Sequence, residues 1–365
     1  MTRWAFRWHG WLGMTAGVFF LLMGLTGSLL LFRGKIDREL HPEWHRVEPR
    51  AGRVSVDSIY RMLAGRYPDL SKIVLHDFPA DSRDSYEFML YRNKRSVTDA
   101  YLYFVFVDPY TGGILGEGGY EKMGASFFRW LYNFHYSLQL GMPGELFTAL
   151  IGALMILSLL TGTIIYRKHF WKVVCFREAV DWGNPRRCLR GLHRVTGVWS
   201  LVFNGVLFFT GFWMNKEFFV PGHWRMSAAP VTVAARINID TLIAVAKRSA
   251  PGFEPIAVNI PGNGEGDVLV RGQLAATYNP LLQGKASEVV FDASTGRLKD
   301  IRDIASQRLD KRWNWAIYRL HIGAWGGDAV RWLYVVMGLM PGLLAVSGGL
   351  LWMRRRGRRN FDPES

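Results

Sequence analysis

Hydrophobic residues along the chain gather into four long stretches that contain no Asp, Glu, Lys or Arg. The stretches cover residues 8–32, 146–166, 195–215 and 332–353. About 20 apolar residues are enough for a helix to cross the hydrocarbon core of a bilayer, which is roughly 30 Å thick. The pattern therefore predicts an α-helical membrane protein with four transmembrane helices. The first stretch is longer than the apolar region of a signal peptide, about 7–15 residues, so we expect it to be uncleaved.

The polar segments between these stretches complete the expected layout of the chain. Two long segments are expected to form extramembrane domains, and a short one forms a loop. The layout is transmembrane helix 1 at 8–33, a first domain at 36–125, an outer histidine-bearing helix with transmembrane helix 2 at 127–167, a loop at 168–190, transmembrane helix 3 at 191–215, a second domain at 216–312, an outer histidine-bearing helix with transmembrane helix 4 at 314–354, and a basic tail at 355–365.

The chain is a tandem repeat of this helix–domain–helix unit. Matching positions are offset by 184 residues near the first histidine of each copy and by 186 near the second. Agreement over so many positions predicts two copies of one structural unit. The matched positions are His9 with His193, Thr26-Gly27 with Thr210-Gly211, Tyr132 with Tyr318, His135 with His321, and Thr161-Gly162 with Ser347-Gly348.

Each polar domain is expected to be a small α+β fold. Helix-like runs at 56–64 and 239–246 are followed by strand-like runs at 101–107 and 288–291. Both strands lead into a five-residue segment that begins with Asp and ends with Gly, at Asp108 and at Asp292. Such segments favour a tight turn, because the glycine can adopt a positive φ.

Charge predicts the orientation of the helices in the membrane. Residues 167–190 carry seven basic side chains and two acidic ones, and the segments before the first stretch and after the fourth are also basic. Basic short loops stay in the cytoplasm, so both termini and this loop are expected there. The net charge of +15 is thus mainly a topology signal, and no basic nucleic-acid-recognition fold is evident. Two cysteines, Cys175 and Cys188, exclude both a disulfide framework in the domains and a Cys-x-x-Cys-His haem attachment.

Several of these motifs resemble one known family. The turn Asp108-Pro-Tyr-Thr-Gly112 after a Val/Phe-rich strand resembles the PepSY domain, and the His-x-x-x-Gly entries at His9 and His193 with later Thr-Gly pairs resemble PepSY-associated transmembrane proteins. The resemblance implies a bacterial inner-membrane protein of iron uptake, similar to ferrisiderophore reductases of the ferrioxamine type that carry two b-type haems. The second turn departs from the pattern, with Ala293-Ser294 in place of Pro-Tyr.

The four repeated histidines are the candidate cofactor ligands. Neutral imidazole is a common axial ligand of haem iron, and two histidines at equal depth on neighbouring helices can hold one haem. The repeat pairs His9 with His193 at the cytoplasmic ends of the helices and His135 with His321 on the outer side. About 39 Å of helix separates His135 from the cytoplasmic end of its own segment, which excludes pairing with His9. A purely interfacial role is the alternative for each histidine.

Other residue patterns give weaker evidence about cofactor or metal binding. Arginines near the histidines could pair with haem propionates or simply flank the membrane; they are Arg7, Arg190 and Arg194 inside and Arg129, Arg319 and Arg331 outside. His41-Pro-Glu-Trp-His45 lacks the arrangement of a zinc-binding helix, so we expect a solvated loop there. No glycine motif for NAD(P)H, flavin or ATP is present.

The expected function is therefore a transmembrane reductase. Electrons from an unidentified cytoplasmic or membrane donor would enter at His9 and His193, pass to His135 and His321, and reduce a ferric siderophore outside. Reduction releases iron because oxygen-donor chelators hold Fe²⁺ less tightly than Fe³⁺. A non-enzymatic PepSY sensor or inhibitory protein, without cofactor, is one alternative. A transporter subunit is another, although the four stretches lack the ionisable residues that ion-coupled transport usually needs. Membrane lipid is an expected partner and nucleic acid is not.

Overall fold

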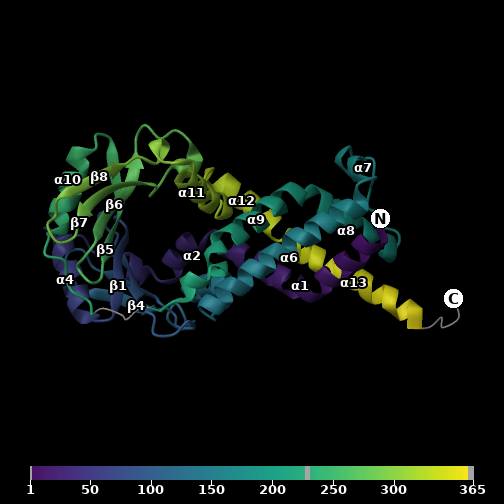
Figure 1. Cartoon of the computed structure of the whole chain (residues 1–365), viewed down its shortest axis with the longest axis horizontal. Helices are drawn as coiled ribbons and strands as arrows, with labels where there is room; N and C mark the ends of the chain where they lie inside the picture. Colours follow the sequence, from purple (N-terminus) through teal and green to yellow (C-terminus); the bar gives the residue numbers. More distant parts are fainter. Residues whose placement is uncertain (1, 227–230, 361–365) are drawn as a thin grey trace. The chain divides into compact units, whose positions relative to one another are not determined.

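The computed structural model describes residues 2–226 and 231–360, and the chain divides into two compact units (Figure 1). The helical unit consists of Met1–Leu31, Glu145–Phe219 and Leu320–Ser365, and the sheet unit consists of Phe32–Gly144 and Val220–Arg319. The last five residues of the expected basic tail, 361–365, lie outside the described residues.

The helical unit holds the long apolar helices. Three helical segments, Arg3–Leu30, Met142–Tyr166 and Gly327–Arg354, are long and apolar enough to cross a membrane. A bent helix pair counts as a fourth if its two halves form one span. The helices are α1 (Thr2–Leu30), α6 (Met142–Tyr166), α7 (Phe170–Val174), α8 (Pro185–Trp199), α9 (Leu201–Met214), α12 (Gly327–Gly338) and α13 (Met340–Asn360), with a short 3₁₀ turn η1 (Lys216–Phe219).

The third apolar stretch is not the single helix expected at 191–215. Helices α8 and α9 meet at Ser200 with a bend of 64°. The Ser200 hydroxyl donates to the Thr196 carbonyl at 2.7 Å, and the Asn204 amide donates to the same hydroxyl at 2.9 Å. A serine that bonds back to the preceding turn is a known cause of helix bending, and apolar composition alone gave no sign of it.

Small residues let the long helices approach one another. A Cβ atom on Gly24 of α1 would lie 2.5 Å from the Gly338 carbonyl oxygen, so the two backbones are in direct contact. Close by, the Ser28 hydroxyl donates to the Val335 carbonyl at 3.2 Å. Close packing of glycines with an interhelical hydrogen bond is a typical way to join helices in a membrane.

The sheet unit is built on one antiparallel sheet with the strand order β4-β3-β2-β1-β5-β6-β7-β8. Both expected domains contribute to this sheet: each half supplies four strands, and β1 pairs with β5, with Ile73 opposite Ile260. The strands are β1 (Leu70–Asp77), β2 (Tyr86–Arg92), β3 (Leu102–Val107), β4 (Ile114–Gly119), β5 (Phe253–Pro261), β6 (Asp267–Leu274), β7 (Ser287–Asp292) and β8 (Leu298–Arg302).

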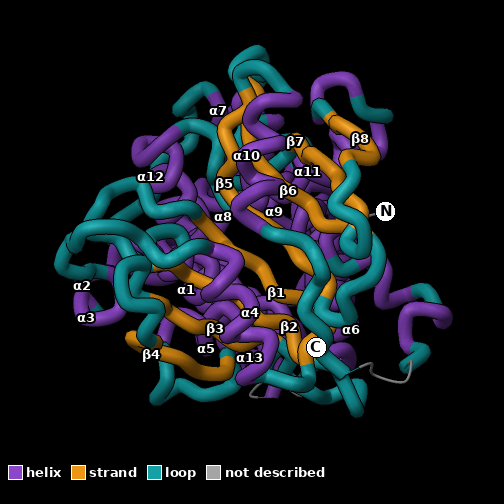
Figure 2. The backbone as a smooth tube through the Cα atoms, turned by 90° about the vertical axis from the view of Figure 1, so that its left-hand side faces the viewer, coloured by secondary structure: helices purple, strands orange, loops and turns teal. Residues whose placement is uncertain are grey.

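Two helices, α4 (Val56–Arg66) and α10 (Ile239–Ser249), cover one face of this sheet (Figure 2). Alternate strand residues such as Ile73, Phe88 and Val270 form the buried core beneath them. The helices also bond to each other at their N-termini. Asp240 accepts from the Asp57 amide at 2.9 Å, and Asp57 accepts from the Ile239 amide at 3.1 Å. The two copies of the repeat therefore share one core.

The remaining elements lie outside this core. Both expected turns are confirmed, with φ of 72° at Gly112 and 70° at Gly296, so the replacement of Pro-Tyr by Ala-Ser leaves the second turn unchanged in form. The other elements are α2 (Arg33–Leu40), α3 (Pro42–His45), α5 (Phe127–Ser137), α11 (Leu309–His321), η2 (Pro221–Trp224), η3 (Pro280–Leu282) and η4 (Ile304–Ser306).

Candidate functional site

The structure brings His9 and His193 together in the helical unit. His9 lies near the start of α1 and His193 in α8, on segments 184 residues apart in the sequence. Their ring centroids are 6.2 Å apart and the ring planes are inclined by 72°. The two side chains are half-buried. The predicted inner pair is therefore a real spatial pair.

Each of these rings is held through its Nδ1 atom by a second helix. His9 Nδ1 lies 3.0 Å from the Ser158 carbonyl and 3.2 Å from the Thr161 hydroxyl of α6. His193 Nδ1 lies 2.9 Å from the Ser347 hydroxyl of α13. Thr161 and Ser347 belong to the repeated Thr-Gly and Ser-Gly pairs, so these motifs position the histidines.

His321, at the end of α11, is held in the same way by α9. Its Nδ1 atom lies 2.9 Å from the Thr210 hydroxyl, in a third copy of the motif. The fourth histidine, His135, lies in α5 of the sheet unit, whereas His321 belongs to the helical unit. The pairing of His135 with His321 stays a prediction.

The hydroxyl groups fix which imidazole nitrogen carries the proton. Thr161, Thr210 and Ser347 each donate their hydroxyl hydrogen to a carbonyl four residues earlier in the same helix, at 2.9, 2.8 and 2.7 Å. The oxygen therefore accepts from the histidine, whose Nδ1 carries the hydrogen. In a neutral imidazole the lone pair is then on Nε2, and we assign this tautomer to all three rings.

The glycine of each motif makes room for the ring. A Cβ atom on Gly162, Gly348 or Gly211 would lie 3.1, 3.1 and 3.2 Å from Cε1 of His9, His193 and His321 respectively. Such contacts are tighter than ordinary van der Waals distances, so a larger residue would press on the imidazole. In each motif the hydroxyl residue therefore holds the imidazole through Nδ1, and the glycine leaves space for the ring.

Three of the arginines near the histidines contact other protein groups. Arg194 pairs with Glu178 at 3.3 Å, and Arg331 pairs with Asp328 at 3.1 Å. Arg319 donates to the Pro280 carbonyl at 3.1 Å. Arg7 and Arg190 are exposed.

Arg129 belongs to a buried charge cluster that sequence reasoning missed. Its guanidinium lies 2.6 Å from carboxylate oxygens of both Asp37 and Glu87, and Asp37 lies 3.2 Å from His45 Nε2. Burial acts to raise the pKa of the Asp37 carboxyl, but His45 and Arg129 outweigh burial and lower it to about 2. The expectation of a solvated loop around His45 is wrong, since His45 is only 8% exposed. The cluster ties α2, α3 and α5 to the sheet.

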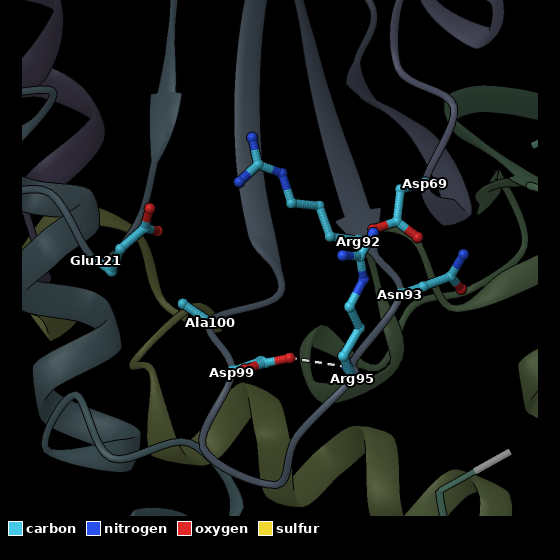
Figure 3. Close-up of a pocket in the computed structure, with 7 residues that line it drawn as sticks. All are labelled: Asp69, Arg92, Asn93, Arg95, Asp99, Ala100 and Glu121. Carbon is cyan, nitrogen blue, oxygen red and sulfur yellow. Dashed lines mark hydrogen bonds and ion pairs between the residues drawn. The ribbon is translucent and has the colours of Figure 1, made fainter. Parts of the chain in front are cut away.

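A small polar pocket lies at one end of the sheet (Figure 3). Its volume is about 290 Å³, at the lower limit of ligand pockets, which hold about 300–1,000 Å³. Much of its charge is neutralised internally, because Arg95 pairs with Asp69 at 3.1 Å and Asp99 accepts from the Arg95 amide at 2.7 Å. Among the described residues, no group of three or more His, Cys, Asp or Glu side chains is arranged to hold a metal ion.

Comparison with known proteins identifies a family and a relative that resemble this chain. The family described as the PepSY-associated TM region matches residues 6–355. A protein of Pseudomonas aeruginosa, described only as uncharacterised, is 27% identical over 260 residues. That match covers 62% of this chain and 63% of the relative, so the chain aligns with less than two thirds of the relative's length.

Proposed function

The chain belongs to the PepSY-associated transmembrane family, and we propose that it is a haem-containing reductase of the bacterial inner membrane that passes electrons to a ferric siderophore. In this proposal the bent pair α8–α9 is one span, which gives four transmembrane helices with both termini in the cytoplasm. Reduction takes place on the periplasmic side and releases Fe²⁺ for uptake. A one-electron donor on the cytoplasmic side or in the membrane supplies the electrons.

The observation that carries the proposal is the way the histidines are held. Metal-binding histidines almost always donate their other ring N–H to a carbonyl, carboxylate or water, which fixes the tautomer and orients the ring. His9, His193 and His321 satisfy this condition through Nδ1, with Nε2 as the ligand atom. An ordinary interfacial histidine has no need of a hydroxyl and a glycine supplied by a second helix.

The inner pair also has a spacing that fits one iron atom. Metal–imidazole bonds are about 2 Å long, so two ring centres on opposite sides of one metal ion lie about 6 Å apart. The observed separation of the His9 and His193 centroids is 6.2 Å. His9 and His193 would hold one haem iron between them through Nε2.

The cofactor and the chain would have distinct tasks. Haem supplies reversible one-electron chemistry when bound, and bis-histidine ligation would place one b-type haem at His9 and His193 and a second at His135 and His321. The chain orients the imidazoles of His9, His193 and His321 through Nδ1, which places the lone pair of each ring on Nε2. Each Fe³⁺ accepts one electron to become Fe²⁺, so no proton transfer by an acid–base residue is needed.

The test of the function is reoxidation of the reduced protein. Protein reduced with dithionite and freed of excess reductant is mixed anaerobically with a ferric hydroxamate siderophore and a chelator that binds only Fe²⁺. The proposal predicts loss of the reduced-haem absorbance together with formation of the Fe²⁺ complex. His321→Ala should stop both, while His169→Ala, a change at an exposed histidine, should leave them unchanged.

The control is the same siderophore without iron, which cannot accept the electron. Reoxidation at equal rates with and without bound iron would show that the siderophore iron is not the acceptor, and the proposed function would then be wrong.

A further inference from the structure

The face of the sheet opposite α4 and α10 carries an unusual pair of cations. Side chains alternate along a strand, so Ile73 points into the shared core and Lys72 points to the opposite face. Arg271 likewise alternates with the core residue Val270. Lys72 stands directly opposite Tyr91 of β2 in the sheet register.

Lys72 lies over an aromatic ring. Its ammonium nitrogen lies 3.8 Å from the centroid of the Tyr91 ring. Within the residues that the structure describes, no carboxylate lies within ion-pair distance of this half-buried lysine. Burial lowers the pKa of the Lys72 ammonium, and the positive charge of Arg271 lowers it further. An uncompensated cation with a cationic neighbour favours binding of an anion.

Among the described residues, Arg271 forms an ion pair with one carboxylate. Its Nε atom lies 3.2 Å from Glu288, which stands opposite it in β7, and its guanidinium carbon lies 5.4 Å from the Trp315 ring centroid of α11. Burial raises the pKa of the Tyr91 phenol, Tyr318 raises it further, and the positive charge of Arg271 opposes the rise. Lys72, Tyr91 and Arg271 therefore lie on one face of the sheet, where Trp315 packs against Arg271 and Arg302 also reaches Glu288 at 3.5 Å.

We propose that Lys72, Arg271 and Tyr91 form a binding face for an anionic, aromatic metal chelate of the catecholate type. The proposal rests on the proposed reductase function and names the charge class of its substrate. The position suits that role, because α11 presents Trp315 and Tyr318 at this face and carries the predicted haem ligand His321 one helical turn beyond Tyr318. The cations attract the negative chelate and the rings offer surfaces for its aromatic groups.

Binding can be measured apart from electron transfer with gallium(III), which has the same charge as Fe³⁺ and is not reduced under these conditions. A gallium tris-catecholate is negatively charged, whereas a gallium trihydroxamate is neutral. Calorimetric titration of the full chain in detergent should show at least about tenfold tighter binding of the catecholate complex, and the difference should shrink with rising salt concentration.

Matched variants locate the site. Lys72→Gln and Arg271→Gln should each weaken binding of the catecholate complex about fivefold to tenfold, and Lys72→Arg should retain it, because the charge is kept. Lys247→Gln removes the same charge from the exposed surface of α10 on the opposite face and should have no effect. Binding of the neutral complex should change little in any of these variants.

Three results would overturn the proposal. These are equal affinity for the two gallium complexes, equal weakening by Lys247→Gln and Lys72→Gln, or displacement of the chelate by inorganic phosphate at equal concentration, which would show a general anion site. None of these measurements requires haem or reduction. A protein that binds the chelate and does not transfer electrons would contradict only the reductase function.

Discussion

The two helices that carry the predicted outer histidines, α5 and α11, each contact the sheet through a cation and an aromatic ring. The helix supplies the cation in α5, whereas the strand supplies it for α11. In α5, Arg129 lies over Phe104 of β3, with the guanidinium carbon 4.3 Å from the ring centroid. The corresponding position of α11, also six residues before the histidine, is Trp315, and the cation there is Arg271 of β6 at 5.4 Å. Each copy of the repeat thus joins helix to sheet by a cation–aromatic pair.

The two cations differ in how far they are neutralised. Arg129 is 8% exposed and pairs with two carboxylates, Asp37 and Glu87. Arg271 is half-buried and, within the part of the chain that the structure describes, pairs with Glu288 alone and has as a neighbour Lys72, which pairs with no carboxylate. The first contact is therefore a structural anchor, and the second leaves positive charge available for a ligand. The repeat thus contains two copies of the contact, and only the copy at Arg129 has its charge fully balanced by carboxylates.

The largest difference between the two contacts should appear on removal of the cation. Arg129→Leu removes the guanidinium that Asp37 and Glu87 share and leaves the buried Asp37 with its contacts to His45 and Ser126. We expect this change to lower the free energy of unfolding by about 3–5 kcal/mol. Thermal unfolding of the purified protein in detergent measures this loss. Adding Asp37→Asn and Glu87→Gln should recover most of it, because no unpaired charge then remains buried. A loss below about 1 kcal/mol for Arg129→Leu would contradict the anchoring role.

Acid should weaken the first contact specifically. The Asp37 carboxyl has a pKa of about 2 in the folded protein against an ordinary value of 3.8, so its contribution is complete above pH 3.8 and is lost as the pH falls toward 2. The difference corresponds to about 2 kcal/mol. Unfolding measured between pH 5 and pH 2 should show this loss in the wild type and a smaller one in Asp37→Asn. Identical pH profiles for the two proteins would be inconsistent with the assignment.

The second contact should matter least for stability. Arg271→Gln removes a half-exposed ion pair with Glu288 and is expected to cost less than about 1 kcal/mol, a loss that salt should reduce further. The same unfolding assay at low and high salt measures it. A salt-insensitive loss as large as that of Arg129→Leu would mean that both contacts are anchors, and the distinction between them would fail.

Much of the fold could be predicted because its signals are local. Absence of charge over more than 20 residues identified the apolar helices, and Asp-to-Gly segments identified both turns. The pairing of β1 with β5 could not be predicted, since nothing in either strand specifies a partner about 185 residues away. The bend at Ser200 could not be predicted for another reason. It depends on a hydrogen bond from the Ser200 hydroxyl to the Thr196 carbonyl, within a segment that is apolar in composition.

The candidate site was predictable to a similar extent. The repeat identified the four histidines and the Thr-Gly motifs, and the structure shows that three of these motifs hold three of the histidines. The cluster around Arg129 was missed because Asp37, His45 and Glu87 are polar residues scattered in sequence. Only the folded arrangement of α2, α3, β2 and α5 brings them into one buried network.

The central claim is that paired histidines hold two haems, and haem content per chain tests it most directly. The measurement is the pyridine-haemochrome absorbance of purified wild type and of single His→Ala variants. We predict about two b-type haems in the wild type and in His169→Ala, and about one in each variant at His9, His193, His135 and His321, because each loses an axial ligand. Full haem content in all four ligand variants, or a wild-type protein that binds no haem, would contradict the account.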